Sequence, residues 1–231
     1  DPTHEYLYMD LVERSPLNPD IIFAVEGTAG LFRSEDGGST WELVYGGVGF
    51  ISGGIGKIVW HPYKPGEVWL VVGISGPNTY SRLLGLSENG SSVKVDVDLD
   101  SLLGSRFSSW IEAIAFDVAN ADVLYAIASN GYFKSLDGGY DWEPIGSAIP
   151  DSLRPYKWTG MIADPRNPHS LFITYENSLY YSNDGLETVR LVEKIIADGA
   201  MNEWSGLIIT TDQLFFGTTT GIYSLSIEGI R

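Results

Sequence analysis

The nine-residue pattern of Arg33–Trp41, RSEDGGSTW, recurs along this chain and constrains its fold more than any other feature. Lys134–Trp142 reads KSLDGGYDW, with Ser, Asp, two Gly and Trp at the same offsets. Tyr181–Thr188 keeps the Ser, the Asp, one Gly and a Thr, and Leu86–Val93 has Asn89 in place of the Asp. The Asp or Asn positions 36, 89, 137 and 184 are successively 53, 48 and 47 residues apart. A period of this length indicates repeated supersecondary units.

Each copy lies between two short apolar segments, which is the pattern of a β-hairpin. The Asp and Ser oxygens can accept hydrogen bonds from backbone N–H groups of a turn, and glycine supplies positive φ. The Trp after the turn can bury a large apolar face. We therefore interpret these residues as structural parts of the turns, not as catalysts or metal ligands. They are Ser34, Asp36, Gly38, Trp41, Ser135, Asp137, Gly139, Trp142, Ser182, Asp184 and Gly185.

The pattern resembles the Asp-box, or BNR repeat, Ser-x-Asp-x-Gly-x-Thr-Trp. This motif occurs in β-propellers such as sialidases, the sortilin ectodomain, xyloglucan-active glycosidases and photosystem assembly factors. The resemblance implies that each box is a corner between the two outer strands of a blade, away from the ligand face. Because Asp-box families are usually extracytoplasmic, it also implies a secreted protein, extracellular or at the cell surface.

Other features repeat in phase with the boxes. A polar turn precedes each box and is flanked by apolar segments, so one repeat has four antiparallel strands, as in a propeller blade. We predict an all-β propeller of about five such blades, forming one domain over residues 1–231. The predicted blades are residues 6–45, 56–97, 110–146, 158–193 and 204–228.

The fifth predicted blade has only three strands, at Leu207–Thr210, Leu214–Gly217 and Ile222–Ile227. An unpaired edge strand is a template for pairing with other chains. Three outcomes are open: the edge stays incomplete, the sequence is cut from something longer, or another molecule donates a strand.

Composition excludes several classes of function. The chain has 30 acidic and 14 basic residues, a net charge of −16, which repels the phosphate backbone of nucleic acids. No apolar run approaches the roughly 18 residues of a membrane span, so we expect no membrane insertion. The chain has no Cys, and its histidines, His4, His61 and His169, are far apart in sequence. We expect neither a cofactor nor a metal site.

The loops between the predicted blades carry the candidate ligand-binding residues. Aromatic rings there can stack on sugar rings, and the tryptophans among them can equally be core residues at the start of each inner strand. These candidates are Phe50, Phe107, Trp110, Tyr156, Trp158, Trp204, Arg106 and Arg154.

Glycoside hydrolysis needs two carboxylates about 5 to 10 Å apart. Asp151 and Glu203 lie on these loops, but carboxylates are common throughout such an acidic chain, and a solvated surface position is the preferred interpretation. No sialidase or xyloglucanase active site maps onto this sequence residue by residue. We therefore expect a non-catalytic module that binds protein or glycan, with self-association through the open last blade as one route. The alternative is a propeller that binds or hydrolyses carbohydrate at its loop face.

Overall fold

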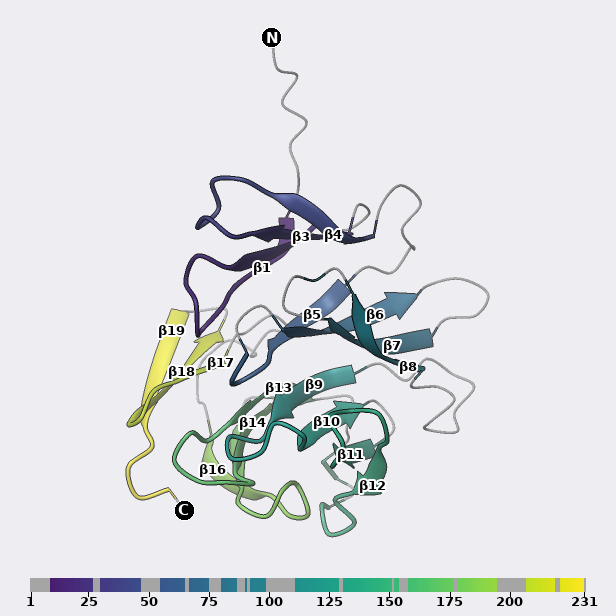
Figure 1. The fold of residues 1–231 in the computed structure, drawn as a ribbon. Helices are drawn as coiled ribbons and strands as arrows, with labels where there is room; N and C mark the ends of the chain where they lie inside the picture. Colours follow the sequence, from purple (N-terminus) through teal and green to yellow (C-terminus); the bar gives the residue numbers. More distant parts are fainter. Residues whose placement is uncertain are drawn as a thin grey trace. The chain divides into compact units, whose positions relative to one another are not determined.

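The structure, a computed structural model, consists of antiparallel β-sheets joined by turns (Figure 1). It describes residues 9–26, 30–46, 55–64, 67–74, 80–86, 90, 92–98, 111–128, 131–150, 152–153, 158–176, 178–194, 207–218 and 221–230. Four sheets have four strands each and the last has three. The predicted fold class is confirmed: an all-β, five-bladed propeller whose last blade has three strands. The chain forms two compact units, Asp1–Ser109 and Trp110–Arg231, which are described separately.

The first unit contains two sheets, in which each strand pairs with the next one along the chain. The first sheet comprises β1 (Met9–Arg14), β2 (Ile22–Glu26), β3 (Gly30–Ser34) and β4 (Glu42–Gly46). The second comprises β5 (Ile55–Trp60), β6 (Val68–Ile74), β7 (Tyr80–Leu86) and β8 (Val93–Asp98). Buried side chains of both sheets, such as Phe23 and Leu70, form one core cluster.

The second unit contains three sheets of the same design. The third sheet comprises β9 (Ile111–Phe116), β10 (Leu124–Ala128), β11 (Gly131–Ser135) and β12 (Glu143–Ile145). The fourth comprises β13 (Trp158–Ala163), β14 (Leu171–Tyr175), β15 (Ser178–Ser182) and β16 (Arg190–Lys194). The fifth comprises β17 (Leu207–Ile209), β18 (Gln213–Thr218) and β19 (Gly221–Ser226).

Burial decreases from the middle of each sheet to its outer strand. All five residues of β10 and all five of β14 are buried, whereas most of β4 and β16 is exposed. In the second unit, Tyr125 and Ile127 of β10 share a core cluster with Leu171 and Ile173 of β14. Side chains of the middle strands pack against the neighbouring sheet of the same unit, which favours apolar residues in these strands.

Candidate functional site

The first Asp-box forms a hydrogen-bonded corner between β3 and β4. The Ser34 hydroxyl donates to Asp36 Oδ1 at 2.8 Å and accepts from the Gly38 N–H at 2.8 Å. The Asp36 carboxylate accepts from the Thr40 hydroxyl at 2.7 Å and from the Thr40 N–H at 2.8 Å. The Thr40 hydroxyl, then its N–H and the Ser34 hydroxyl, lower the pKa of Asp36 to about 2. These bonds hold the carboxylate within its own turn.

The second and third copies have the same geometry, between β11 and β12 and between β15 and β16. The bond from serine hydroxyl to aspartate is 2.9 Å in both. Burial alone would raise the pKa values of Asp137 and Asp184, but hydrogen bonds from the Asp141 N–H to Asp137 and from Thr188 to Asp184 lower them.

The corner tryptophans donate to the backbone: Trp41 Nε1 to the Gly38 carbonyl at 3.0 Å and Trp142 Nε1 to the Gly139 carbonyl at 2.9 Å. Trp41 keeps 39% of its surface exposed.

The predicted ligand-binding and catalytic loops fall almost entirely outside the described residues. Trp158 is the first residue of β13, and its side chain is not among those described. All of these candidates stay predictions, as does the half of the fourth Asp-box copy that lies outside the described residues. Those outside the described residues are Phe50, Arg106, Phe107, Trp110, Asp151, Arg154, Tyr156, Glu203 and Trp204.

A buried polar side chain braces the polar turn after the first strand of each four-stranded sheet. Ser15, His61, Asp117 and Asp164 occupy this position and are all buried. Their side chains accept N–H bonds from the turn: to Ser15 from Asn18 at 3.3 Å, to His61 from Tyr63 at 3.1 Å, to Asp117 from Ala119 at 2.8 Å and to Asp164 from Arg166 at 3.0 Å. The shared role of these residues is not evident from the sequence, because three different side-chain types fill it.

Two of these braces also connect neighbouring sheets of the second unit. Asp117 Oδ2 accepts the His169 N–H at 2.6 Å, and the Tyr125 hydroxyl lies 3.1 Å from His169 Nδ1. Burial, followed by the negative charge of Asp117, raises the pKa of Tyr125. This cluster ties the third sheet to the turn between β13 and β14.

The second connection anchors the last sheet. Arg166 donates from Nε and Nη2 to the two oxygens of Asp164, at 2.8 and 2.7 Å, and from Nη1 to the Ile227 carbonyl at 2.5 Å. Burial would raise the pKa of Asp164, but the bonds from Arg166 lower it. A charge-neutralised arginine thus fastens the chain immediately after β19 to the fourth sheet.

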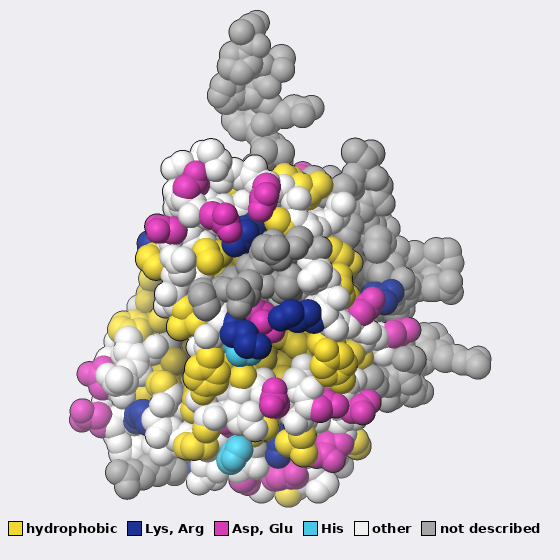
Figure 2. Space-filling view, viewed as in Figure 1, with side chains coloured by type: hydrophobic (Ala, Val, Ile, Leu, Met, Phe, Trp, Pro, Cys, Tyr) yellow, Lys and Arg dark blue, Asp and Glu magenta, His cyan; other side chains and the backbone are white. Residues whose placement is uncertain are grey.

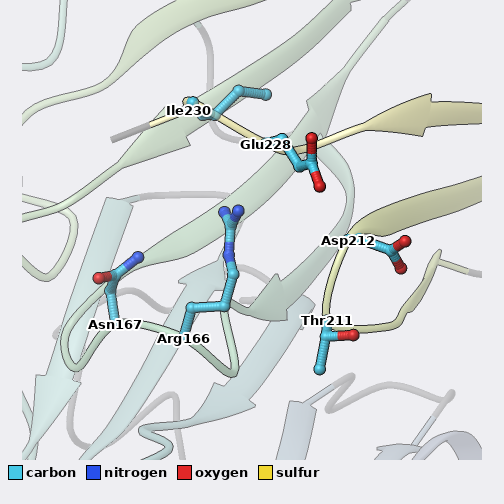
Figure 3. A pocket seen from close by; sticks show the side chains of 7 residues that line it. Arg166, Asn167, Thr211, Asp212, Glu228 and Ile230 are labelled. Atoms are coloured by element: carbon cyan, nitrogen blue, oxygen red, sulfur yellow. The ribbon is translucent and has the colours of Figure 1, made fainter.

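A pocket of about 550 Å³ lies beside this arginine (Figure 3). It is lined by Arg166, Asn167, Thr211, Asp212, Glu228, Gly229 and Ile230. The carboxylate of Asp164 already neutralises the positive charge of Arg166. The carboxylates of Asp212 and Glu228 therefore give the pocket a net negative charge. Such a lining suits hydrogen-bond donors and basic groups better than anions.

The outermost described strand of the last sheet, β19, differs from the corresponding strands of the other sheets. It follows the middle strand β18, as β3, β11 and β15 follow theirs, but those three are largely buried whereas five of the six β19 residues are exposed. Among the described residues no strand pairs with the far side of β19. Ile222 is 83% exposed and Tyr223 is 38% exposed. Hydrophobic side chains are visible on the surface over this sheet (Figure 2).

β19 differs from the outer strands of the other sheets in its lack of charged side chains. Each of those outer strands carries charged side chains, which discourage pairing with other molecules. They are Glu42 in β4, Lys94, Asp96 and Asp98 in β8, Glu143 in β12, and Arg190, Glu193 and Lys194 in β16. The β19 sequence, GIYSLS, has no charged residue. Its edge therefore lacks the protection that the other four edges have.

The described residues contain no group of three His, Asp or Glu side chains arranged to hold a metal ion. Asp96, one of the alternating acidic residues of β8, forms an ion pair with Arg82 of β7. No helix in the described part of the chain is long and apolar enough to cross a membrane.

No protein-family model matches the sequence, and no curated protein sequence is significantly similar to it. Solved structures are similar in fold. The GH74 enzyme of Niastella koreensis aligns with a TM-score of 0.65 at 15% identity, over 90% of this chain and 34% of that one. YCF48 bound to D1 peptide aligns with a TM-score of 0.65 at 14% identity, over 98% and 67%. An auxiliary nutrient binding protein from Bacteroides thetaiotaomicron aligns with a TM-score of 0.62 at 12% identity, over 97% and 56%.

The chain thus spans about a third of the GH74 enzyme and just over half of the nutrient binding protein. At these identities the similarity concerns the fold and not the activity. By structure, this chain is a β-propeller similar to GH74 and YCF48 propellers.

Proposed function

We propose that this protein is a non-catalytic binding or assembly module that takes up an extended polypeptide strand at the edge of β19. The observation that carries the proposal is the exposed, uncharged edge of β19, in a sheet one strand shorter than the other four. Strand addition to a sheet edge uses backbone hydrogen bonds for affinity and side-chain contacts for selectivity. An added fourth strand would give the last sheet the same number of strands as each of the other sheets.

Two further observations support a binding role. Every Asp-box carboxylate with a described side chain is held by hydrogen bonds within its own turn. Two proteins of similar fold are a YCF48 bound to a peptide and a nutrient binding protein. Hydrolysis of a polysaccharide, in keeping with the fold of the GH74 enzymes, is the competing function.

The experiment measures binding of a labelled peptide with the sequence TVRLVEK, that of Thr188–Lys194, which includes the outer strand β16 of the fourth sheet. We expect its fluorescence anisotropy to rise with a Kd on the order of 100 µM, because so short a strand buries little area. A scrambled peptide of the same composition is the control. Equal binding of both peptides would contradict selective strand addition. Binding of neither, together with a chain that stays monomeric, would contradict strand addition altogether.

The competing function is tested in parallel with xyloglucan and a panel of other polysaccharides. We expect no released sugar. Turnover that Asp151→Asn or Glu203→Gln abolishes would establish a glycosidase and overturn the proposal of a non-catalytic module.

We also propose that the protein works outside the cell, a proposal that rests on the likeness of its corners to those of extracytoplasmic families. Fractionation of cells that produce the natural protein tests this. Recovery in the cytoplasmic fraction alone would contradict it.

A further inference from the structure

We propose that the strand taken up by β19 is β19 of a second copy of the same chain, so that two protomers join their last sheets edge to edge around a twofold axis. This inference rests on the proposed function of strand addition and names the partner. It concerns a single short segment, Gly221–Ser226.

The hydrogen-bond ladder between β18 and β19 shows which backbone groups of β19 point away from β18. β18 and β19 are antiparallel, with Gln213 opposite Ser226, and the Ile227 N–H donates to the Asp212 carbonyl at 2.9 Å. Hydrogen-bonded and non-hydrogen-bonded pairs alternate along an antiparallel ladder. The residues Ile222, Ser224 and Ser226 therefore direct their N–H and C=O groups away from β18.

This edge is complementary to itself. An antiparallel pair centred on Ser224 places Ser224 opposite Ser224 of the partner subunit, and Ile222 opposite Ser226 of the partner subunit. On the other face of the sheet, Tyr223 lies opposite Leu225 of the partner subunit. Aromatic–aliphatic and hydroxyl–hydroxyl cross-strand pairs stabilise a sheet. Both faces of the joint sheet therefore gain contacts that neither protomer has alone.

Charge favours this edge for self-pairing over the outer strands β4, β8, β12 and β16 of the other four sheets, each of which carries charged side chains. Two copies that each carry −16 repel one another at long range. Pairing of β8 with itself would bring Asp96 and Asp98 of both copies together, and like charges opposite each other destabilise a sheet. Pairing of β19 brings no charge to the interface, so salt that screens the net charge should strengthen the dimer.

The small size of the interface sets the expected affinity. β19 contributes six residues per protomer, whereas a stable interface uses roughly 20 to 30 residues a side. We therefore expect a weak dimer with a Kd on the order of 100 µM, which is favoured at high protein concentration.

The experiment is sedimentation velocity on the whole chain at concentrations from about 5 to about 500 µM, which bracket this Kd. We expect the weight-average mass to rise from the monomer value of 25.3 kDa towards twice that mass, and to rise further at higher salt. Ser224→Pro removes an outward N–H without removing a bond to β18, since proline is tolerated at such edge positions. We expect Ser224→Pro to be monomeric throughout, and the matched control Ser224→Ala, which keeps the N–H, to dimerise.

Hydrogen exchange gives a second readout that does not depend on any variant. On raising the wild-type concentration, we expect slower exchange at the amides of Ile222, Ser224 and Ser226. Exchange of the alternate amides, which already bond to β18, should change little.

The results of these experiments distinguish a failure of self-pairing from a failure of the strand addition on which it rests. If the wild type stays monomeric while the labelled peptide binds, the strand partner is another polypeptide and the self-pairing is wrong. If neither the peptide nor a second copy binds, both proposals are wrong. A dimer that Ser224→Pro leaves intact would place the interface elsewhere and would also overturn the inference.

Discussion

Leu186 occupies in the third Asp-box corner the position that Gly139 occupies in the second. The N–H of each donates to the hydroxyl of the serine four residues earlier, at 3.0 Å from Leu186 to Ser182 and at 2.8 Å from Gly139 to Ser135. Both residues have positive φ, 69° for Leu186 and 91° for Gly139. Leucine is disfavoured in this region, yet its side chain is fully buried in the core shared by the third and fourth sheets.

Substitution of Leu186 separates these opposing effects. Removing the buried side chain should cost about 2 to 4 kcal/mol of unfolding free energy, whereas glycine recovers about 1 kcal/mol of backbone strain. We therefore expect both Leu186→Gly and Leu186→Ala to be destabilised, with the glycine variant the more stable of the two. Urea denaturation measures this order. An alanine variant more stable than the glycine variant would show that the left-handed backbone of Leu186 carries no strain.

Loss of the Asp184 carboxylate should weaken the third corner. It accepts from the Ser182 hydroxyl at 2.9 Å, the Thr188 N–H at 3.0 Å and the Thr188 hydroxyl at 2.5 Å. Each of these bonds contributes roughly 1 kcal/mol net, and water can replace part of them in the variant. We therefore expect Asp184→Ala to lower the unfolding free energy by about 2 kcal/mol. Thermal and urea unfolding test this. Glu193→Ala, at an exposed position of β16, is the matched control and should change the unfolding free energy by less than about 0.5 kcal/mol.

Acid should destabilise the fold through the same corners. The folded-state pKa values of Asp36, Asp137 and Asp184 are lowered, that of Asp36 to about 2. A carboxyl whose pKa is lower in the folded state stabilises the fold fully above the unfolded-state pKa, near 3.9. That stabilisation is lost as the pH falls through the folded value. We expect the unfolding free energy to decline between about pH 4 and pH 2.

The pH dependence of the triple variant Asp36→Asn, Asp137→Asn and Asp184→Asn tests this assignment. Asparagine does not titrate, so we expect a shallower decline over the same interval. Parallel curves for the wild type and the triple variant would assign the acid sensitivity to other carboxyls.

The ion pair between Arg166 and Asp164 should stabilise the attachment of the last sheet to the fourth. Arg166→Met leaves the carboxylate of Asp164, which is fully buried, without its counter-charge, and we expect a loss of about 3 kcal/mol. Asp164→Asn combined with Arg166→Met removes both charges and should restore part of the loss. A double-mutant cycle from urea denaturation measures the coupling. Additive effects would show that the two side chains act independently.

Local chemistry explains why the fold was predictable. The nine residues of an Asp-box contain nearly all the groups of its corner, as the bonds among Ser34, Asp36, Gly38 and Thr40 show. The predicted strands Leu207–Thr210 and Leu214–Gly217 match β17 and β18 to within one residue at each end, because apolar runs between turns indicate strands. The last predicted strand, Ile222–Ile227, differs slightly from β19, since Ile227 belongs to the following turn.

The site residues were harder to predict. The turn braces Ser15, His61 and Asp117 share only an acceptor atom at one position, so no residue pattern reveals them. The bond from Arg166 to the Ile227 carbonyl joins positions 61 residues apart and depends on how two sheets meet. The predicted aromatic loop residues, from Phe50 to Trp204, remain a hypothesis about a ligand face.

The amino-acid sequence by itself determined the period, the corners and the number of sheets, because turn hydrogen bonds and strand polarity are properties of short segments. Only the tertiary structure decided which side chains those sheets bury and how far the residues of the open last edge are exposed. Leu186 shows the first, since a residue that strains its own turn is held by the core around it. β19 shows the second: no described strand pairs with its far side, so its uncharged residues, which a fourth strand would cover, stay exposed.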